Sequence, residues 1–333
     1  MQKERIYALD WIRILACLMV IFMHAPLPSD GANGVFLLAN SYLTAPCIGL
    51  FFMVSGALLL PVKMPTKVFL QKRFLKVCIP IFIWSIFYLL LSWNSAERFV
   101  QHVLSIPFSA QGTGILWFMY TLMGLYLLAP ILSKWLEGTS KKELEFYLFL
   151  WFITLCYSLL KLYLEINDTN TGIFYYFSGY AGYFLLGYYV NRFYKNIRIK
   201  YLLLPVLLSL AAPIIGKVLQ WQVDFYQVFW YLSIFVLIQC LTWFVVICKC
   251  SERSNKLNKK AETISSLSFG IYLVHIFFMR SMVWKWDWIL SIQNYIIQTF
   301  TVFVLTMIFS LVFCYLISLL PFGDYIIGYK QKT

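Results

Sequence analysis

Long apolar stretches recur from one end of the chain to the other, and short polar stretches separate them. Each apolar stretch, folded as a helix, is long enough to cross a hydrocarbon core of about 30 Å. The pattern therefore predicts an all-α polytopic membrane protein with about ten transmembrane helices. No stretch is polar enough for a separate soluble domain, so we expect residues 1–333 to form a single integral membrane domain. We place the helices at 6–27, 35–60, 74–93, 114–133, 145–163, 173–191, 201–217, 225–247, 264–284 and 294–320.

One segment between predicted spans, 94–114, has a different pattern. Its apolar residues recur at helical spacing among polar ones, which predicts a short amphipathic helix on the outer surface. His102 lies in this helix and is interpreted as an interfacial side chain. The apolar residues are Ala96, Phe99, Val100, Val103 and Leu104.

Composition agrees with a membrane protein, because 61% of the residues are hydrophobic and only 12% are charged. The formal net charge of +13 first suggests a nucleic-acid partner. Most of the 27 Lys and Arg residues, however, fall in the loops on one side of the predicted helices. By the positive-inside rule, this side and both termini are cytoplasmic, so the charge indicates topology and no nucleic-acid partner is expected.

The eight cysteines do not predict disulfide bonds, because most of them fall inside apolar stretches. Cys248 and Cys250 flank Lys249 on the predicted cytoplasmic side, where thiols stay reduced. No cluster of His, Cys, Asp or Glu has the spacing of metal ligands, so no metal site is expected.

The first apolar stretch contains three ionisable residues, Asp10, Arg13 and His24. Eleven steps of 100° separate Arg13 from His24, so both lie on one face of the helix, and Asp10 is their neighbour on that face. Ionisable side chains are costly in hydrocarbon, so this stripe must face protein, water or a ligand. The stretch also lacks a small-residue cleavage site, and we expect it to be a retained helix.

His275 is the second histidine inside an apolar stretch, with Tyr272 one turn before it. Two interpretations stay open for His275: support of catalysis, or a hydrogen bond to a neighbouring helix. Trp117 lies just inside the outer end of its predicted helix, at the estimated depth of His24, and is a candidate wall of an acceptor pocket.

Several segments together resemble the acyltransferase-type-three membrane family, which includes bacterial O-acetyltransferases of surface polysaccharides. The resemblance spans roughly Leu9 to His275 and depends on the order and spacing of the segments. In this order they are Leu9-Asp10-Trp-Ile-Arg13 with His24, Phe51-Phe52-Met-Val-Ser55-Gly56, Leu116-Trp117-Phe118 with Tyr126 and Pro130, Gly182-Tyr-Phe-Leu-Leu-Gly187, and Ser268-Phe-Gly270-Ile-Tyr272-Leu-Val-His275.

This resemblance implies an enzyme of the bacterial cytoplasmic membrane that uses cytosolic acyl-CoA, most simply acetyl-CoA, as the acyl donor. The acceptor would be a hydroxyl of a cell-surface glycan or of its lipid-linked precursor. His24 is the candidate general base, because a neutral imidazole can take a hydroxyl proton near neutral pH. A transient acyl-histidine and direct attack both remain open. Arg13 would orient the donor or form an ion pair with Asp10, and this pair could also serve helix packing alone.

A basic cluster of Lys72, Arg73 and Lys76 lies where the cytoplasmic loop enters the third predicted helix. Topology and lipid headgroups alone would explain this cluster. The alternative is a docking site for the phosphates of coenzyme A. The family often has Arg-x-x-Arg here, and Lys76 keeps the charge but lacks the planar fork that binds phosphate in two places. Apart from acyl-CoA and the glycan or glycolipid acceptor, membrane lipids are the only other partners expected.

A transporter of an acyl group or of a small solute, such as an amino acid, is the alternative class of function. Transporters usually show paired repeats and interrupted helices at corresponding positions, and the sequence shows neither. The acceptor hydroxyl, the choice between acetyl and succinyl, and the oligomeric state are left open by the sequence.

Overall fold

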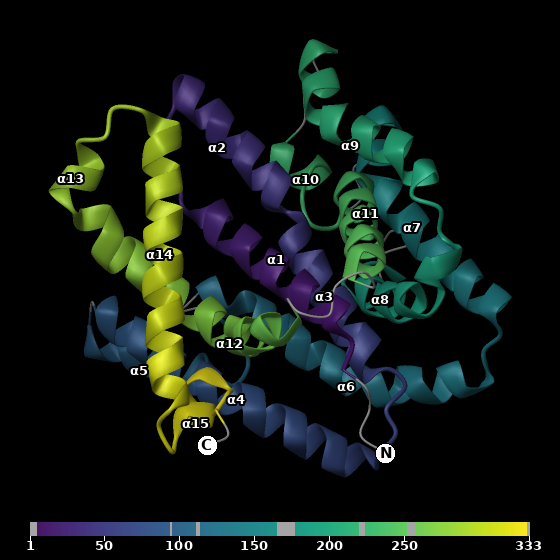
Figure 1. Ribbon diagram of the computed structural model, residues 1–333, viewed down its shortest axis with the longest axis horizontal. Coiled ribbons are helices and arrows are strands. Elements are labelled where there is room, and N and C mark those ends of the chain that lie inside the picture. The colour runs from purple at the N-terminus through teal and green to yellow at the C-terminus, as the bar shows by residue number, and fades with distance from the viewer. Residues whose placement is uncertain are drawn as a thin grey trace. The chain divides into compact units, whose positions relative to one another are not determined.

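The computed structural model describes residues 5–93, 95–110, 114–164, 177–219, 224–251 and 258–331 (Figure 1). Within these residues every regular element is helical, which confirms the all-α prediction. Eight segments of the described residues are long and apolar enough to cross a membrane, so the protein is polytopic. They are α1 (Tyr7–His24), α2 with α3 (Gly31–Thr44 and Pro46–Leu59), α4 (Thr66–Leu91), α6 (Trp117–Gly138), α9 (Lys200–Val218), α11 (Ile234–Ser251), α12 with the following turns (Ala261–Lys285) and α14 (Tyr295–Ser318).

The remaining two predicted spans, 145–163 and 173–191, correspond to α7 (Lys141–Leu164) and α8 (Ala181–Phe193). Helix α7 is 24 residues long and contains the whole predicted span, but it is not among the eight candidate spans of the described residues. Helix α8 has only 13 residues, and the first residues of the predicted span lie outside the described part of the chain. The amphipathic helix predicted within 94–114 is confirmed as α5 (Ala96–Ser105).

The chain divides into two compact units. Unit 1 combines Met1–Met23, Ser29–Leu60 and Lys134–Ala261, and unit 2 combines His24–Pro28, Pro61–Ser133 and Glu262–Thr333. Each unit therefore draws on segments that are distant in sequence. That residues 1–333 act as a single membrane domain stays a prediction.

In unit 1, α3 and α8 pack with their backbones in direct contact. A Cβ atom at Gly56 would collide with the carbonyl of Phe184, and a Cβ atom at Gly187 would collide with the carbonyl of Met53. Small residues allow such close approach between membrane helices. The Ser55 hydroxyl donates to the Phe51 carbonyl one turn earlier, 2.8 Å away, so this hydrogen bond stays within α3.

In unit 2, side chains of α4 are hydrogen-bonded to the C-terminal half of the chain. The Tyr88 hydroxyl donates to the Leu273 carbonyl of α12 at 2.7 Å, and the Trp84 indole donates to the Ile326 carbonyl of α15 (Gly323–Ile327) at 3.0 Å. Helix α12 (Asn258–Ile276) continues into a π-helical segment, η4 (Phe277–Met282), and a short 3-10 turn, η5 (Val283–Lys285). π-Helical turns frequently occur at functional sites, so the residues in and beside η4 are candidates for the functional site.

Candidate active site

Two histidines far apart in sequence lie side by side in unit 2. His24 is the last residue of α1, and His275 is the penultimate residue of α12. Their ring centroids are 5.7 Å apart, and the ring planes are inclined by 32°. The sequence singled out both histidines separately, and the structure brings them together.

The protonation of His275 follows from its hydrogen bond. Its side chain is buried, and its Nδ1 lies 2.7 Å from the Tyr272 carbonyl oxygen. Because a carbonyl oxygen only accepts, Nδ1 carries the proton and the neutral ring has a lone pair on Nε2. This Nε2 atom is buried and has no hydrogen-bond partner among the described residues. Buried polar atoms are normally paired, so an unpaired acceptor at this place points to a group supplied by a ligand or water.

A row of aromatic rings leads away from His275. The Tyr272 ring is 5.8 Å from the His275 ring, and the Phe118 ring is 5.5 Å from the Tyr272 ring. Trp117 begins α6 directly before Phe118, with 6.4 Å between their ring centroids. Tyr272 is thus directly beside His275, whereas Trp117, the predicted wall of the acceptor pocket, is connected to the histidine pair through Phe118 and Tyr272. The sequence analysis did not select Phe118 as a candidate.

Arg280, in η4, is the functional candidate that the sequence analysis missed. Its guanidinium carbon lies 5.6 Å from the centroid of the Trp284 ring, and the Trp284 indole donates to the Ala25 carbonyl at 3.3 Å. Ala25 directly follows His24, and Arg280 interacts electrostatically with both His24 and His275. The sequence did contain a signal for Arg280. An arginine inside a predicted apolar span costs free energy in hydrocarbon, so its presence indicates a specific function or partner.

The three ionisable residues predicted to share one face of α1 are divided between the two units. Asp10 and Arg13 belong to unit 1, whereas His24 belongs to unit 2. Asp10 is buried and receives two hydrogen bonds from Arg5, Nε to Oδ2 at 2.8 Å and Nη2 to Oδ1 at 3.1 Å. This bidentate pair fixes the start of the helix. The pairing of Asp10 with Arg13 stays a prediction.

The predicted acyl-CoA cluster lies in the first turns of α4. Lys72 and Lys76 are exposed, and the half-buried Arg73 places its guanidinium carbon 5.9 Å from the Phe69 ring centroid. Tyr88, fifteen residues after Arg73 on α4, donates to a carbonyl of α12 two residues before His275. At 1.5 Å per residue, the basic cluster is about 22 Å along the helix from the level of that contact.

Within the described part of the chain, no three His, Cys, Asp or Glu side chains are grouped so that they could hold a metal ion. The candidate site instead contains two imidazoles, one guanidinium and aromatic rings. Such a set can transfer a proton and stabilise negative charge without a metal.

Comparison with known proteins gives one assignment. Residues 6–319 match a family described as an acyltransferase domain, the acyltransferase 3 family. No curated protein and no solved structure matches the chain. The matched region contains both histidines, Arg280 and the basic cluster of α4. The chain therefore belongs to the acyltransferase 3 family and is a multi-pass membrane acyltransferase.

Proposed function

We propose that the protein transfers an acetyl group from cytosolic acetyl-CoA to a hydroxyl of a cell-surface glycan or of its lipid-linked precursor. The membrane would be the bacterial cytoplasmic membrane, with the basic end of α4 toward the cytosol. The pairing of His24 with His275 is the observation that carries the proposal, because acyl transfer to an alcohol requires a positioned base.

His24 acts as the general base in this mechanism. The acceptor oxygen attacks the thioester carbonyl while a nitrogen of His24 takes the hydroxyl proton, which forms a tetrahedral intermediate. As the intermediate collapses, the carbon–sulfur bond breaks, and the coenzyme A sulfur leaves with the proton returned from His24. His275 is buried, whereas His24 is half-buried, so His24 is the imidazole that we assign to contact with the reacting hydroxyl.

His275 and Arg280 assist this reaction in different ways. The unpaired Nε2 of His275 accepts a hydrogen bond from a neighbouring hydroxyl of the glycan acceptor, which leaves the proton of the reacting hydroxyl directed toward His24. Arg280 carries a permanent positive charge and stabilises the negative charge that develops on the carbonyl oxygen. Trp117 and Tyr272 line the acceptor side of the site, and the Phe118 ring is adjacent to both of their rings.

The donor approaches from the opposite end of α4. Lys72, Arg73 and Lys76 bind the phosphates of coenzyme A, and the pantetheine arm extends along the helix toward the histidines. Arg13 orients the donor from α1 in this proposal. Asp10 supports the start of α1 through its bidentate pair with Arg5.

The Arg73→Ala variant is expected to raise the apparent KM for acetyl-CoA by about 10-fold to 100-fold, because one charge-assisted phosphate contact contributes about 1.5–3 kcal/mol. The apparent KM for the acceptor should change little. Arg73→Lys should recover only part of the loss, since lysine binds phosphate as a point charge. Steady-state kinetics in membranes with each substrate varied in turn measures both constants. Equal changes in the two constants would assign Arg73 to topology alone.

The His275→Asn variant separates the two functions of the His275 ring. The asparagine amide can still donate to the Tyr272 carbonyl, but it has no group at the position of Nε2. We expect kcat to fall about 10-fold to 100-fold while the protein stays folded, because the acceptor loses its orienting partner. Transfer rates and thermal stability of the purified protein check this result. Unchanged kcat would assign His275 to helix packing.

Membrane vesicles that expose the predicted cytoplasmic face of the protein to the outer solution test the proposed function as a whole. They receive acetyl-CoA labelled in the acetyl group, and the label is then measured in extracted glycolipid and glycan. The proposal predicts covalent transfer that depends on the protein. Counterflow of a small solute without any acetylated product would instead establish the transporter.

A further inference from the structure

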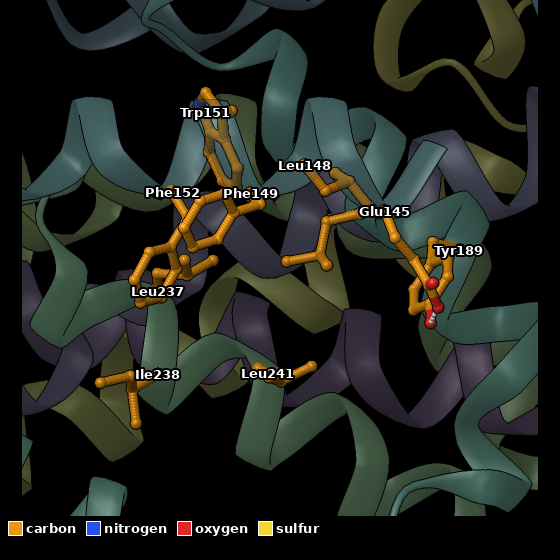
Figure 2. A pocket seen from close by; sticks show the side chains of 10 residues that line it. Glu145, Leu148, Phe149, Trp151, Phe152, Tyr189, Leu237, Ile238 and Leu241 are labelled. Atoms are coloured by element: carbon orange, nitrogen blue, oxygen red, sulfur yellow. Dashed lines mark hydrogen bonds between the residues drawn. The ribbon is translucent and has the colours of Figure 1, made fainter. Parts of the chain in front are cut away.

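An apolar groove with one charged end lies in unit 1, and it includes none of the candidate active-site residues. It has a volume of about 400 Å³ and is formed by α7, α8 and α11 (Figure 2). Its apolar wall includes Leu148 and Phe152 of α7, Leu186 of α8, and Ile238 and Leu241 of α11. This volume is near the lower limit for ligand pockets, so it suits one hydrocarbon chain better than a whole lipid.

The groove offers almost no polar atoms along its length. The indole N–H of Trp151, which lines it, already donates to the Gly179 carbonyl at 2.9 Å. Phe149 and Phe152 are 58% and 38% exposed, so this surface of α7 faces the surrounding medium. In a membrane protein that medium is lipid, and a concave apolar surface there is complementary to an acyl chain.

Glu145 and Tyr189 form the charged end of the groove, opposite Phe152 and Leu237 (Figure 2). The Tyr189 hydroxyl donates to Glu145 Oε1, and Lys141 Nζ lies 3.4 Å from the same oxygen. Lys141 also lies 4.8 Å from the centroid of the Phe193 ring, and the exposed Lys142 follows it in sequence. The first turns of α7 thus carry two ammonium groups, of Lys141 and Lys142, and two carboxylates, of Glu143 and Glu145, and Glu145 is the carboxylate that lines the groove.

We propose that the groove binds one acyl chain of a phospholipid whose headgroup carries a primary ammonium, of the phosphatidylethanolamine type. The headgroup ammonium donates hydrogen bonds to Glu145, and the lipid phosphate contacts Lys141 and Lys142. The chain extends past Leu148 toward Phe152, a distance of about 10 Å along α7.

The charges of the site select this headgroup over the other common ones. A phosphatidylglycerol headgroup would bring no cation to Glu145, and its net negative charge would be repelled by the carboxylate. A choline headgroup carries a cation but no N–H group, so it cannot donate to the carboxylate oxygen. Because exposed ion pairs contribute only about 0.2–1 kcal/mol, we expect a preference of about twofold to fivefold over phosphatidylglycerol.

Photo-crosslinking of the full-length protein tests the position of the chain. The probe is phosphatidylethanolamine with a diazirine in one acyl chain, present in vesicles of equal parts phosphatidylethanolamine and phosphatidylglycerol. Crosslinks are expected at Leu148, Phe149 and Leu241. Leu241→Trp or Ile238→Trp should lower them by about an order of magnitude, because the indole fills the groove. Leu207→Trp, at an exposed apolar position of α9 outside the groove, is the matched control and should leave them unchanged.

A second arm of the experiment tests the headgroup. A phosphatidylglycerol probe with the same diazirine chain should crosslink less than the phosphatidylethanolamine probe, and Glu145→Lys should reverse that order. Equal yields from both probes, or tryptophan variants with unchanged yields, would overturn the proposal. Preferential crosslinking by a polyprenyl-phosphate probe would also overturn it, because the groove would then hold an isoprenoid chain.

Discussion

Replacement of His24 by alanine is expected to lower the rate of acetyl transfer by about 10²-fold to 10⁴-fold, the usual contribution of a positioned general base. His24 is the last residue of α1 and is half-buried, so truncation of its side chain should leave the protein folded. The measurement is the initial rate of label transfer at saturating acetyl-CoA, normalised to the amount of folded protein in the membrane.

His102→Ala is the matched control for this variant. His102 lies in the last turn of α5, and its backbone carbonyl accepts a hydrogen bond from the Ser105 hydroxyl, which the substitution keeps. We expect the His102 variant to retain its activity. If both variants lose activity equally, or if His24→Ala stays active, His24 is not the catalytic base.

Gly56→Leu is expected to destabilise the folded protein by at least about 3 kcal/mol, the upper end of the usual cost of overpacking. A side chain at this position collides with backbone, the Phe184 carbonyl, and backbone cannot move aside as a flexible side chain can. Gly187→Leu should have a similar effect, because its side chain would meet the Met53 carbonyl from the other helix. Thermal unfolding in detergent, followed by the fraction that remains monodisperse, measures both effects.

The control for these glycines is Gly124→Ala in α6. No atom lies within 4 Å of a Cβ built at Gly124, and alanine favours a helix over glycine by up to about 1 kcal/mol. This variant should therefore be as stable as the original protein or slightly more stable. A Gly56→Leu protein as stable as the Gly124→Ala protein would contradict the direct backbone contact of α3 and α8.

The sequence predicted the helical architecture because hydrocarbon permits few structures, and apolar stretches of sufficient length identify helices directly. The predicted span at 145–163 lies within α7. The prediction was less accurate for α8, because the span at 173–191 relied on apolar residues alone, whereas the described helix α8 begins only at Ala181.

The sequence also identified His24 and His275, because ionisable residues are costly in hydrocarbon and therefore indicate a functional site when they lie in apolar stretches. It could not predict that their rings lie 5.7 Å apart, because this contact depends on the tertiary packing of segments distant in sequence. Arg5 was missed as the partner of Asp10 because it precedes α1, and helical spacing says nothing about a residue outside the helix. Arg280 was missed for a related reason: it lies in a π-helical segment, where the positions that share a face differ from those of an α-helix.

A structure of the protein with acetonyl-CoA, a non-hydrolysable ketone analogue of acetyl-CoA, would test the central claim most directly. The account predicts that the carbonyl carbon of the analogue lies beside the His24 and His275 rings, within about 3–3.5 Å of the acceptor oxygen's position. It also predicts that the phosphates contact Lys72, Arg73 and Lys76. An analogue whose acyl end lies away from both imidazoles would contradict the account.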